Sequence, residues 1–348
     1  MIAVSFFSGA GGMDIGIEKS GFKVILNVEF DKKCCETLIL NNESLNVICD
    51  NINNYSKERV YLDSNIDEKV DIELIFGGSP CQSFSVAGKR KGFLDDRGKS
   101  LIKFIELIEE IKPKAFLLEN VKGLLSSKVI VDEVELNALD YIISLFKSYN
   151  VNYKLINSAY YGVPQKRERV FLVGIRNDIN KEFNFPKETH KDNLISVEEV
   201  FNDIKCEKHT FVKYSDKRLY YMKLIPKSGG NWRDLDDNIV KDAMGGAYNS
   251  NGGRTGYFRR IKLNEPSPTL LTSPSQNSTN LGHPLEDRPL SIEEYMAIQG
   301  FEPTYLFSGS IRDKYRQIGN AVPIKVGFII GKEIFNTLNN DSLAVVIE

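Results

Sequence analysis

The N-terminal segment alternates apolar runs with a glycine-rich loop and a helical pattern, and this alternation constrains the fold more than any other feature. Residues 2–7 are mostly apolar, residues 8–12 read Ser-Gly-Ala-Gly-Gly, and residues 13–20 carry apolar side chains at helical spacing. Gly21 is suited to a helix C-cap, and a second apolar run follows at 22–28. A strand, a tight loop, a helix and another strand in this order predict an α/β fold with a doubly wound parallel sheet.

The ends of the predicted strands carry residues suited to a nucleoside. Asp14 occupies the third glycine position of the dinucleotide fingerprint, which disfavours a pyrophosphate ligand. Glu29 follows the second apolar run at the spacing from Gly9 at which such folds place a carboxylate on a ribose hydroxyl. Asp50 ends a short run at 46–50 and can accept a hydrogen bond from an adenine amino group, although a strand-end Asp is also a common helix cap. Together these strand ends predict an adenosine pocket.

A cysteine follows the fourth apolar run in a stiff loop. Residues 72–76 precede Gly-Gly-Ser-Pro and then Cys81. The glycines permit close approach of a ligand, and Pro80 fixes φ next to the thiol. The thiol is therefore either a nucleophile or a buried structural cysteine in a tight turn. Glycines and five cations in residues 86–99 favour a lid that closes on phosphates over a solvated charged loop.

A carboxylate follows the fifth apolar run, residues 115–118. Because parallel strands end at one edge of a sheet, we expect Glu119 to lie close to Cys81. Amphipathic patterns predict helices at 101–111, 136–149, 289–298 and 324–338, and further strands are expected at 153–157 and 170–175.

Composition changes after the middle of the chain. Residues 205–284 are rich in glycine, serine, asparagine, arginine and aromatic side chains and lack a long helical period. We expect a small, irregular second domain there, and a larger domain at 1–204 that 285–348 completes. Arginines interleaved with aromatic residues in the second domain predict a surface that grips nucleic acid; they are Arg254, Arg259 and Arg260.

Composition and charge bear on several other classes of protein. The net charge is −2, so a nucleic-acid partner requires a local basic groove. The five cysteines form no Cys-x-x-Cys pair and the three histidines are far apart, which supports neither a disulfide framework nor a metal site. No apolar run is long enough to span a bilayer, and the N-terminus lacks a basic start. We therefore expect a cytoplasmic protein without a membrane contact.

Six short motifs resemble those of the DNA cytosine-5 methyltransferases, in the family's order and across almost the whole chain. They are residues 7–12, 79–82 (Ser-Pro-Cys-Gln), 119–121 (Glu-Asn-Val), 165–169 (Gln-x-Arg-x-Arg), 288–301 and 319–323 (Gly-Asn-Ala-Val-Pro). Three residues depart from the family pattern: Ser5 stands where many members have Asp, Ser79 where proline is usual, and Glu302 where proline is frequent. None of these changes removes a group that the chemistry requires.

The resemblance implies a Rossmann-like sheet that binds S-adenosylmethionine, yields S-adenosylhomocysteine and needs no metal ion. It implies that Cys81 adds to C6 of a flipped-out cytosine and that Glu119 stabilises the adduct at N3. Arg167 and Arg169 are then expected to hold O2 of the base and the nearby backbone. The implied cofactor-binding residues are Phe7, Gly9, Gly11, Gly12, Glu29, Asp50, Asn51, Gly78, Pro80 and Asn320.

The implied partner is double-stranded DNA with a short specific sequence. Thr269 belongs to a Thr-Leu pair that resembles the family's recognition signature, and Gln276 follows it. The expected DNA-binding residues are Gln82, Ser85, Lys89, Arg97, Gln165, Arg254, Arg259, Arg260, Thr269 and Gln276. The compact form predicts a monomeric bacterial or phage enzyme of a restriction-modification system, with a cognate endonuclease that makes no stable contact.

Other interpretations remain open. The tRNA cytosine-5 methyltransferases share these motifs, but the Cys-Phe-Thr segment that marks them is not found in this sequence. A solitary DNA methyltransferase would have the same features. A regulatory homologue without catalysis would be expected to lose Cys81 or Glu119, and both are present. Asp14 disfavours a nicotinamide oxidoreductase.

Overall fold

The computed structural model of the chain describes residues 1–79, 96–131, 133–249, 254–276 and 278–339. It divides into two compact units. The first consists of Met1–Asn157, Glu168–Glu188 and the segment from Ile324 onward, and the second consists of Ser158–Arg167 and Thr189–Pro323. In the described part of the chain, no helix is long and apolar enough to cross a membrane.

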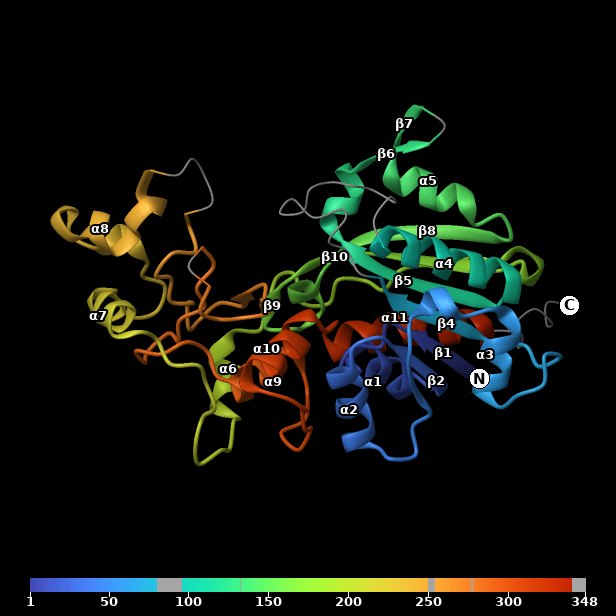
Figure 1. Cartoon of the computed structure of the whole chain (residues 1–348), viewed down its shortest axis with the longest axis horizontal. Coiled ribbons are helices and arrows are strands. Elements are labelled where there is room, and N and C mark those ends of the chain that lie inside the picture. Colours follow the sequence, from blue (N-terminus) through green and yellow to red (C-terminus); the bar gives the residue numbers. More distant parts are fainter. Residues whose placement is uncertain (80–95, 132, 250–253, 277, 340–348) are drawn as a thin grey trace, which may run out of the picture. The chain divides into compact units, whose positions relative to one another are not determined.

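A seven-stranded sheet forms the first unit (Figure 1). Its strands are β1 (Ile2–Phe6), β2 (Lys23–Glu29), β3 (Val47–Cys49), β4 (Leu74–Gly78), β5 (Ala115–Val121), β8 (Tyr149–Asn157) and β10 (Glu168–Arg176). The order is β3-β2-β1-β4-β5-β10-β8, with the first five strands parallel and β10 antiparallel to both its neighbours. Because the winding reverses between β1 and β4, ligands are expected at the carboxyl ends of these strands. The predicted doubly wound, Rossmann-like sheet is confirmed.

Helices cover both faces of this sheet (Figure 1). They are α1 (Gly12–Lys19), α2 (Lys32–Asn41), α3 (Lys57–Ser64), α4 (Asp96–Ile111), α5 (Ala138–Leu145) and α11 (Ile324–Asn339). Alternate strand residues such as Val4 and Phe6 share one buried cluster with Phe104 of α4 and Ile142 of α5. On the other face α1 and α11 pack against each other. A two-stranded antiparallel sheet, β6 (Lys128–Val131) with β7 (Val134–Asn137), completes the strands of this unit.

The helix predicted at 136–149 is shorter in the structure. The Asn137 side chain accepts hydrogen bonds from the backbone N–H groups of Leu139 (2.8 Å) and Asp140 (3.3 Å), so α5 begins directly after it. The helix ends at Leu145, and Tyr149 instead begins β8. Tyr149 donates its hydroxyl to Pro113 O at 2.8 Å, a contact between distant segments that apolar spacing does not reveal.

The second unit is mostly helical and irregular. Its elements are α6 (Val197–Asn202), α7 (Asp216–Leu224), α8 (Asp237–Met244), α9 (Ile292–Gln299), α10 (Ile311–Asn320), and the parallel strands β9 (Gln165–Lys166) and β11 (Ser267–Pro268). The chain also forms short 3₁₀ helices at Ile52–Asn54, Lys122–Ser126, Ser158–Tyr161, Asn177–Ile179, Trp232–Asp234 and Gly245–Asn249. A small apolar core surrounds α7 and α8 and includes Tyr221, Met222, Val240, Met244 and Phe258.

The second unit extends beyond the predicted target-recognition segment. Residues 205–284 lie wholly within it, together with 189–204 and 285–323, whereas only the chain from Ile324 onward returns to the first unit. Compactness alone does not assign a function to a segment. The assignment of catalysis and cofactor binding to 1–204, completed by 285–348, and of target recognition to 205–284 therefore stays a prediction.

Candidate active site and cofactor pocket

Glu119 lies at the carboxyl end of β5, next to the end of β4. Gly78 is its partner in the β4–β5 register, and a Cβ atom at Gly78 would lie 3.0 Å from Glu119 Oε2. Glu119 is 9% exposed. The end of β4, which leads to the predicted nucleophile, therefore lies beside the carboxyl group of Glu119. Pro80 and Cys81 themselves lie outside the described residues.

Arg169 pairs with Glu119 within the first unit. Its Nε lies 3.1 Å from Glu119 Oε1, and its Nη1 donates a hydrogen bond to Glu168 O at 2.8 Å. Arg169 belongs to β10, whose antiparallel register with β5 sets it opposite Val121. Both side chains of the pair are largely buried, so their interaction is less screened than at the surface. The arrangement offers a carboxyl group and a cation at one end of the sheet.

Ser79 joins the ends of β4 and β5 through a hydrogen bond that sequence reasoning missed. Asn120 Nδ2 donates to Ser79 Oγ at 2.9 Å, and Val121 N–H donates to Asn120 Oδ1 at 2.8 Å. Ser79 and Asn120 are buried. A proline at position 79 has no side-chain acceptor, so Ser79 supplies a contact that the more usual residue cannot. An Asn directly after Glu119, at the end of an apolar run, was the available signal.

The glycine loop and Glu29 hold each other in place. Glu29 Oε2 accepts the N–H of Gly9 at 2.8 Å, and Oε1 accepts the N–H of Asp31 at 2.7 Å. Burial raises the pKa of Glu29, an effect that these two N–H groups oppose. Gly9 and Gly11 have φ of 56° and 80°, a left-handed region that favours glycine, and Gly12 begins α1. The predicted strand–loop–helix turn is therefore built around this carboxylate.

Asp50 follows β3 and is held by three partners. Its Oδ1 accepts hydrogen bonds from Asn51 N and Asn54 Nδ2, each at 2.7 Å, and its Oδ2 lies 2.7 Å from Arg59 Nη1. The hydrogen bond from Asn54 is the largest of the effects that hold the pKa of Asp50 below its usual range. Asn51 in turn caps the short helix that follows, accepting the N–H of Asn53 at 3.0 Å. The carboxylate of Asp50 is thus ionised and fixed in direction.

Residues 1–336 match the family of C-5 cytosine-specific DNA methylases. The chain belongs to this family. Type II methyltransferase M.Sau96I of Staphylococcus aureus is 43% identical over 337 residues, which cover 96% of this chain and 75% of the relative. Type II methyltransferase M.PspPI of Psychrobacter sp. (strain TA137) is 38% identical over 346 residues, with coverage of 97% and 79%.

A solved structure agrees with the fold of this methylase. The protein in that structure is encoded within an Escherichia coli prophage and is described as a DNA modification methyltransferase. It matches this chain with a TM-score of 0.70 and 24% identity, over 97% of this chain and 99% of that chain. As a C-5 cytosine-specific DNA methylase, the enzyme transfers a methyl group to carbon 5 of cytosine in DNA. Family membership implies S-adenosylmethionine as the methyl donor.

The described residues of the methylase fit an adenosine-containing ligand. A Cβ atom at Gly9 would have Phe7 O, 4.0 Å away, as its nearest neighbour, so the loop leaves open space beside its backbone. The Phe7 backbone is left-handed, at φ 55°, and its half-buried ring lies 5.9 Å from the ring of Phe104. Glu29 and Asp50 add fixed carboxylates suited to hydroxyl and amino donors. Among the described residues no cluster of side chains suits a metal ion.

Two residues of the Gln-x-Arg-x-Arg motif are buried in the second unit. Arg167 is 2% exposed and donates hydrogen bonds to Gly319 O (3.0 Å) and Asn320 O (3.1 Å). Gln165 is fully buried; its Oε1 accepts the N–H of Leu270 at 2.9 Å. Arg167 thus supports the backbone of the Gly-Asn-Ala-Val-Pro motif at 319–323. The expected contacts of Gln165 with DNA and of Arg167 with the base stay predictions.

The three arginines predicted to grip DNA contact backbone carbonyl groups instead of forming an exposed row. Arg260 is 1% exposed and donates to Met222 O and Glu286 O, among others. Arg259 Nε donates to Asn280 O at 3.4 Å, and Arg254 Nη1 donates to Tyr248 O. In this placement Arg260 stabilises the second unit, and DNA contacts of the other two arginines stay predictions.

The remaining predicted DNA contacts have different placements. Thr269 Oγ1 donates to Lys166 O at 2.8 Å, next to the short β9–β11 pairing. Gln276 is exposed, and its Oε1 accepts a hydrogen bond from Thr279 Oγ1 at 3.2 Å. Gln82, Ser85 and Lys89 lie outside the described residues, as does the side chain of Arg97.

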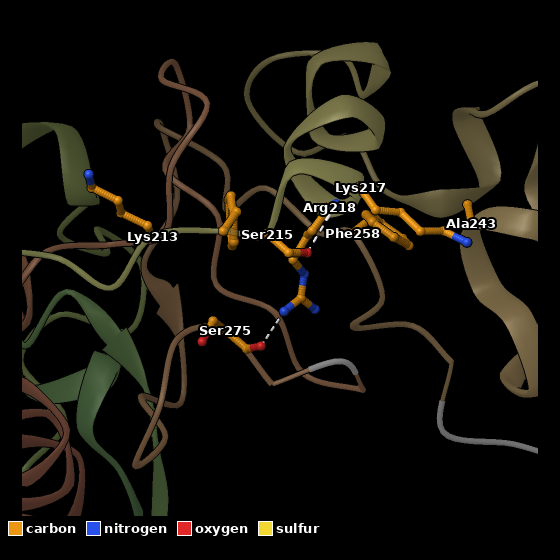
Figure 2. Close-up of a pocket in the computed structure, with 8 residues that line it drawn as sticks. Lys213, Ser215, Lys217, Arg218, Ala243, Phe258 and Ser275 are labelled. Atoms are coloured by element: carbon orange, nitrogen blue, oxygen red, sulfur yellow. Dashed lines mark hydrogen bonds between the residues drawn. The ribbon is translucent and has the colours of Figure 1, made fainter.

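Sequence reasoning also missed a basic cavity near Gln276 (Figure 2). Lys213, Lys217 and Arg218 line it together with Phe258 and Ser275. Three cations within six consecutive residues were the available signal.

Proposed function

We propose that the methylase acts on a cytosine flipped out of double-stranded DNA and that Cys81 is its nucleophile. A base inside the duplex cannot meet a thiol held at a sheet edge, so it must leave the stack. Addition of the Cys81 thiolate to C6 raises electron density at C5, which is otherwise too weak a nucleophile to accept a methyl group. C5 would then take the methyl group of S-adenosylmethionine, whose sulfur–methyl bond breaks to leave S-adenosylhomocysteine. Loss of the C5 proton and elimination of the thiolate would release the methylated base.

The pairing of Glu119 with Arg169 carries this proposal. The 3.1 Å contact lies at the end of β5, whose neighbour β4 leads to Cys81. Glu119 would share a proton with N3 of the base, and Arg169 would hold O2, so that negative charge on the ring is stabilised as the thiolate adds. Arg167 would contribute by supporting the backbone that it bonds.

The donor would bind along the carboxyl ends of β1, β2 and β3. Phe7 would stack on the adenine, Glu29 would accept the ribose hydroxyls, and Asp50 would accept the adenine amino group. Gly9, Gly11, Gly12, Asn51, Gly78, Pro80 and Asn320 would complete the pocket. S-adenosylmethionine supplies the methyl group when bound. No metal ion is required, because the residues above account for both the nucleophile and the charge stabilisation.

The enzyme's biological role would be protection of host DNA in a restriction-modification system. Its relatives M.Sau96I and M.PspPI are named Type II methyltransferases, which supports this assignment. It would act as a cytoplasmic monomer, without a stable contact with a cognate endonuclease. Thr269 and Gln276 would read bases within a site of roughly 4–6 base pairs, since single recognition modules make limited interfaces.

A trapping experiment tests the proposed chemistry. Wild-type protein with S-adenosylmethionine should form a covalent complex with duplex DNA that contains 5-fluorocytosine, because the fluorine prevents the elimination step. Cys81→Ser should bind S-adenosylmethionine normally by calorimetry and form no adduct on a denaturing gel. Cys206→Ser, a matched change at an exposed cysteine, should be trapped like the wild type.

Two results would overturn the assignment. Trapping by Cys81→Ser would show that another residue is the nucleophile. Absence of labelled methyl transfer to mixed-sequence duplex DNA, with donor binding demonstrated, would reject the proposed reaction. Bisulfite sequencing of DNA from an expressing host identifies the methylated sequence, and a parallel assay on tRNA transcripts tests the RNA alternative.

A further inference from the structure

Two cysteine thiols lie together at the ends of β2 and β3. Cys35 belongs to the first turn of α2, and Cys49 is the last residue of β3, where it is the register partner of Glu29. Cys35 Sγ donates a hydrogen bond to Glu29 O at 3.3 Å. Cys49 Sγ donates to the next carbonyl group, Phe30 O, at 3.8 Å. Both sulfur atoms therefore contact the same short stretch of backbone.

The two thiols differ in their access to solvent. Cys49 is exposed, whereas Cys35 is 4% exposed. Burial raises the pKa of the Cys35 thiol, and its side-chain hydrogen bond with Cys49 raises that pKa further. The pair thus consists of an accessible thiol, which an oxidant in solution meets first, and a buried, protonated thiol in contact with it.

A small movement is enough to bridge such a pair. Sulfur atoms in a disulfide lie about 2.0 Å apart, which is less than the distance between two thiols that are only in contact. Cys35 lies on a helix, whereas Cys49 lies at the end of β3, the edge strand of the seven-stranded sheet. The end of an edge strand can approach the helix without displacing the central strands.

The thiol pair is connected to both carboxylates of the proposed donor pocket. Glu29 O, which accepts the Cys35 thiol, also accepts the N–H of Asp50 at 3.0 Å. Asp50 directly follows Cys49 in the chain. The cap of α2, Asp31, donates its N–H to Glu29 Oε1 at 2.7 Å. A movement of Cys49 toward the helix therefore shifts Asp50 relative to Glu29.

We propose that Cys35 and Cys49 are a modification site at which a peroxide forms a disulfide, and that this disulfide weakens binding of the methyl donor. The Cys49 sulfur attacks hydrogen peroxide: a sulfur–oxygen bond forms, the oxygen–oxygen bond breaks, and the released hydroxide takes the Cys49 proton as water. The Cys35 sulfur then attacks the Cys49 sulfur, the sulfur–oxygen bond breaks, and the hydroxyl group leaves with the Cys35 proton as a second water. Two thiols are oxidised and one peroxide is reduced.

The effect on donor binding rests on the proposed function, because it assumes that Glu29 and Asp50 bind adenosine. Formation of the disulfide does not depend on that assumption. A shift of Asp50 weakens its hydrogen bond to the adenine amino group, so the dissociation constant should rise by roughly two- to tenfold, the usual contribution of one hydrogen bond.

Disulfide formation is tested by peptide mapping. The reduced full-length protein is treated with hydrogen peroxide, its remaining thiols are alkylated, and its peptides are analysed by mass spectrometry. No Lys or Arg lies between the two cysteines, so a glutamate-specific protease, which cuts after Glu36 and Glu43, is used to separate them. The wild type should yield a linked pair of peptides, carrying Cys35 and Cys49, that dithiothreitol cleaves.

Cys34→Ser is the matched control, because Cys34 is a buried cysteine next to Cys35 in the same peptide. The link should persist in Cys34→Ser and be lost in Cys35→Ser and Cys49→Ser. A link that requires Cys34 instead of Cys35 would overturn the assignment. Absence of the link under conditions that oxidise Cys206, an exposed cysteine of the second unit, would overturn the modification site.

The effect on the donor is tested by calorimetry with S-adenosylmethionine before and after peroxide treatment. The wild type should lose affinity by roughly two- to tenfold and regain it with dithiothreitol, whereas Cys49→Ser should keep its affinity throughout. An equal loss in Cys49→Ser would show that oxidation acts elsewhere, and unchanged affinity in the linked wild type would overturn the effect on binding. If Glu29→Ala binds the donor like the reduced wild type, the proposed pocket is wrong, while the linked peptides still decide the modification site.

Discussion

At the scale of single residues, Arg59 orients the carboxylate that is proposed to bind adenine. Its guanidinium lies 4.3 Å from the ring centroid of Tyr55, its Nε lies 3.2 Å from Asp63 Oδ2, and its Nη1 lies 2.7 Å from Asp50 Oδ2. The side chain is thus anchored on two sides before it reaches Asp50. No sequence motif marks this contact, because Arg59 lies in α3, outside the strand ends.

Arg59→Met should weaken S-adenosylmethionine binding by roughly two- to fivefold, since a partly exposed ion pair contributes up to about 1 kcal/mol. The kcat at saturating donor should stay close to that of the wild type, and Arg59→Lys should recover part of the affinity. Calorimetry measures the dissociation constants directly. Equal constants for wild type and Arg59→Met would show that Asp50 does not depend on Arg59.

Asp14 should make stability depend on pH. Burial raises the pKa of Asp14 to about 7, and its Oδ1 accepts Asn27 Nδ2 at 2.6 Å. Because the folded state favours the protonated acid, this group's contribution to stability is present below its unfolded pKa and is lost as pH rises toward about 7. Asp14→Asn removes that titration.

The wild type should therefore lose more thermal stability between pH 5 and pH 8 than Asp14→Asn does. Melting temperatures at intervals of one pH unit provide the comparison, and the difference should develop mainly below about pH 7. Parallel curves for the two proteins would contradict the raised pKa.

At the scale of elements, close backbone contact brings α11 back to α1. A Cβ atom at Gly16 would lie 2.5 Å from Ile324 O and 2.6 Å from Phe328 N, so only glycine fits there. Gly327 of α11 lies in the same contact between the two helices, and a Cβ atom there would lie 3.0 Å from Met13 O. The amphipathic period predicted α11, whereas its docking partner depends on these glycines.

Gly16→Ala should destabilise the first unit by about 1–3 kcal/mol, the usual cost of forcing extra atoms into a packed contact. Chemical denaturation followed by circular dichroism measures the change. Gly246→Ala is the matched control, because a Cβ atom there would meet nothing within 4 Å. A midpoint for Gly16→Ala equal to that of the control would argue against the tight packing.

At the scale of the whole molecule, acid should affect the second unit through a buried histidine. Burial lowers the pKa of His283 to about 4, despite Glu294 Oε1 lying 3.4 Å from its Nε2. The neutral ring also accepts the N–H of Glu286 at its Nδ1, 2.9 Å away. Because the folded pKa is depressed, this contribution to stability is present above about pH 6.5 and is lost as pH falls through about 4.

Trp232, the single tryptophan, lies in the second unit and reports its unfolding by fluorescence. Between pH 6.5 and 4 the denaturation midpoint of this signal should fall more steeply in the wild type than in His283→Asn. Identical pH profiles would show that His283 does not titrate in this range.

Prediction from the sequence succeeded where the information is local. The strand ends of β1, β2, β4 and β5 follow from short apolar runs, and Glu119 lies next to the end of β4 because parallel strands end together. The helix predicted at 136–149 ends early, at Leu145, because Tyr149 belongs to β8, which pairs with β10 from a later part of the chain.

The sequence by itself predicted the succession of strands and helices along the chain and the chemistry proposed at the strand ends, since periodicity and motifs are properties of neighbouring residues. Only the tertiary structure decided which cations are buried and which stay exposed. Arg260 donates hydrogen bonds to carbonyl groups from distant segments, whereas Lys213 stays exposed. The physical reason is that a guanidinium is buried only where the fold supplies enough acceptors, and those acceptors come from parts of the chain that local patterns cannot relate.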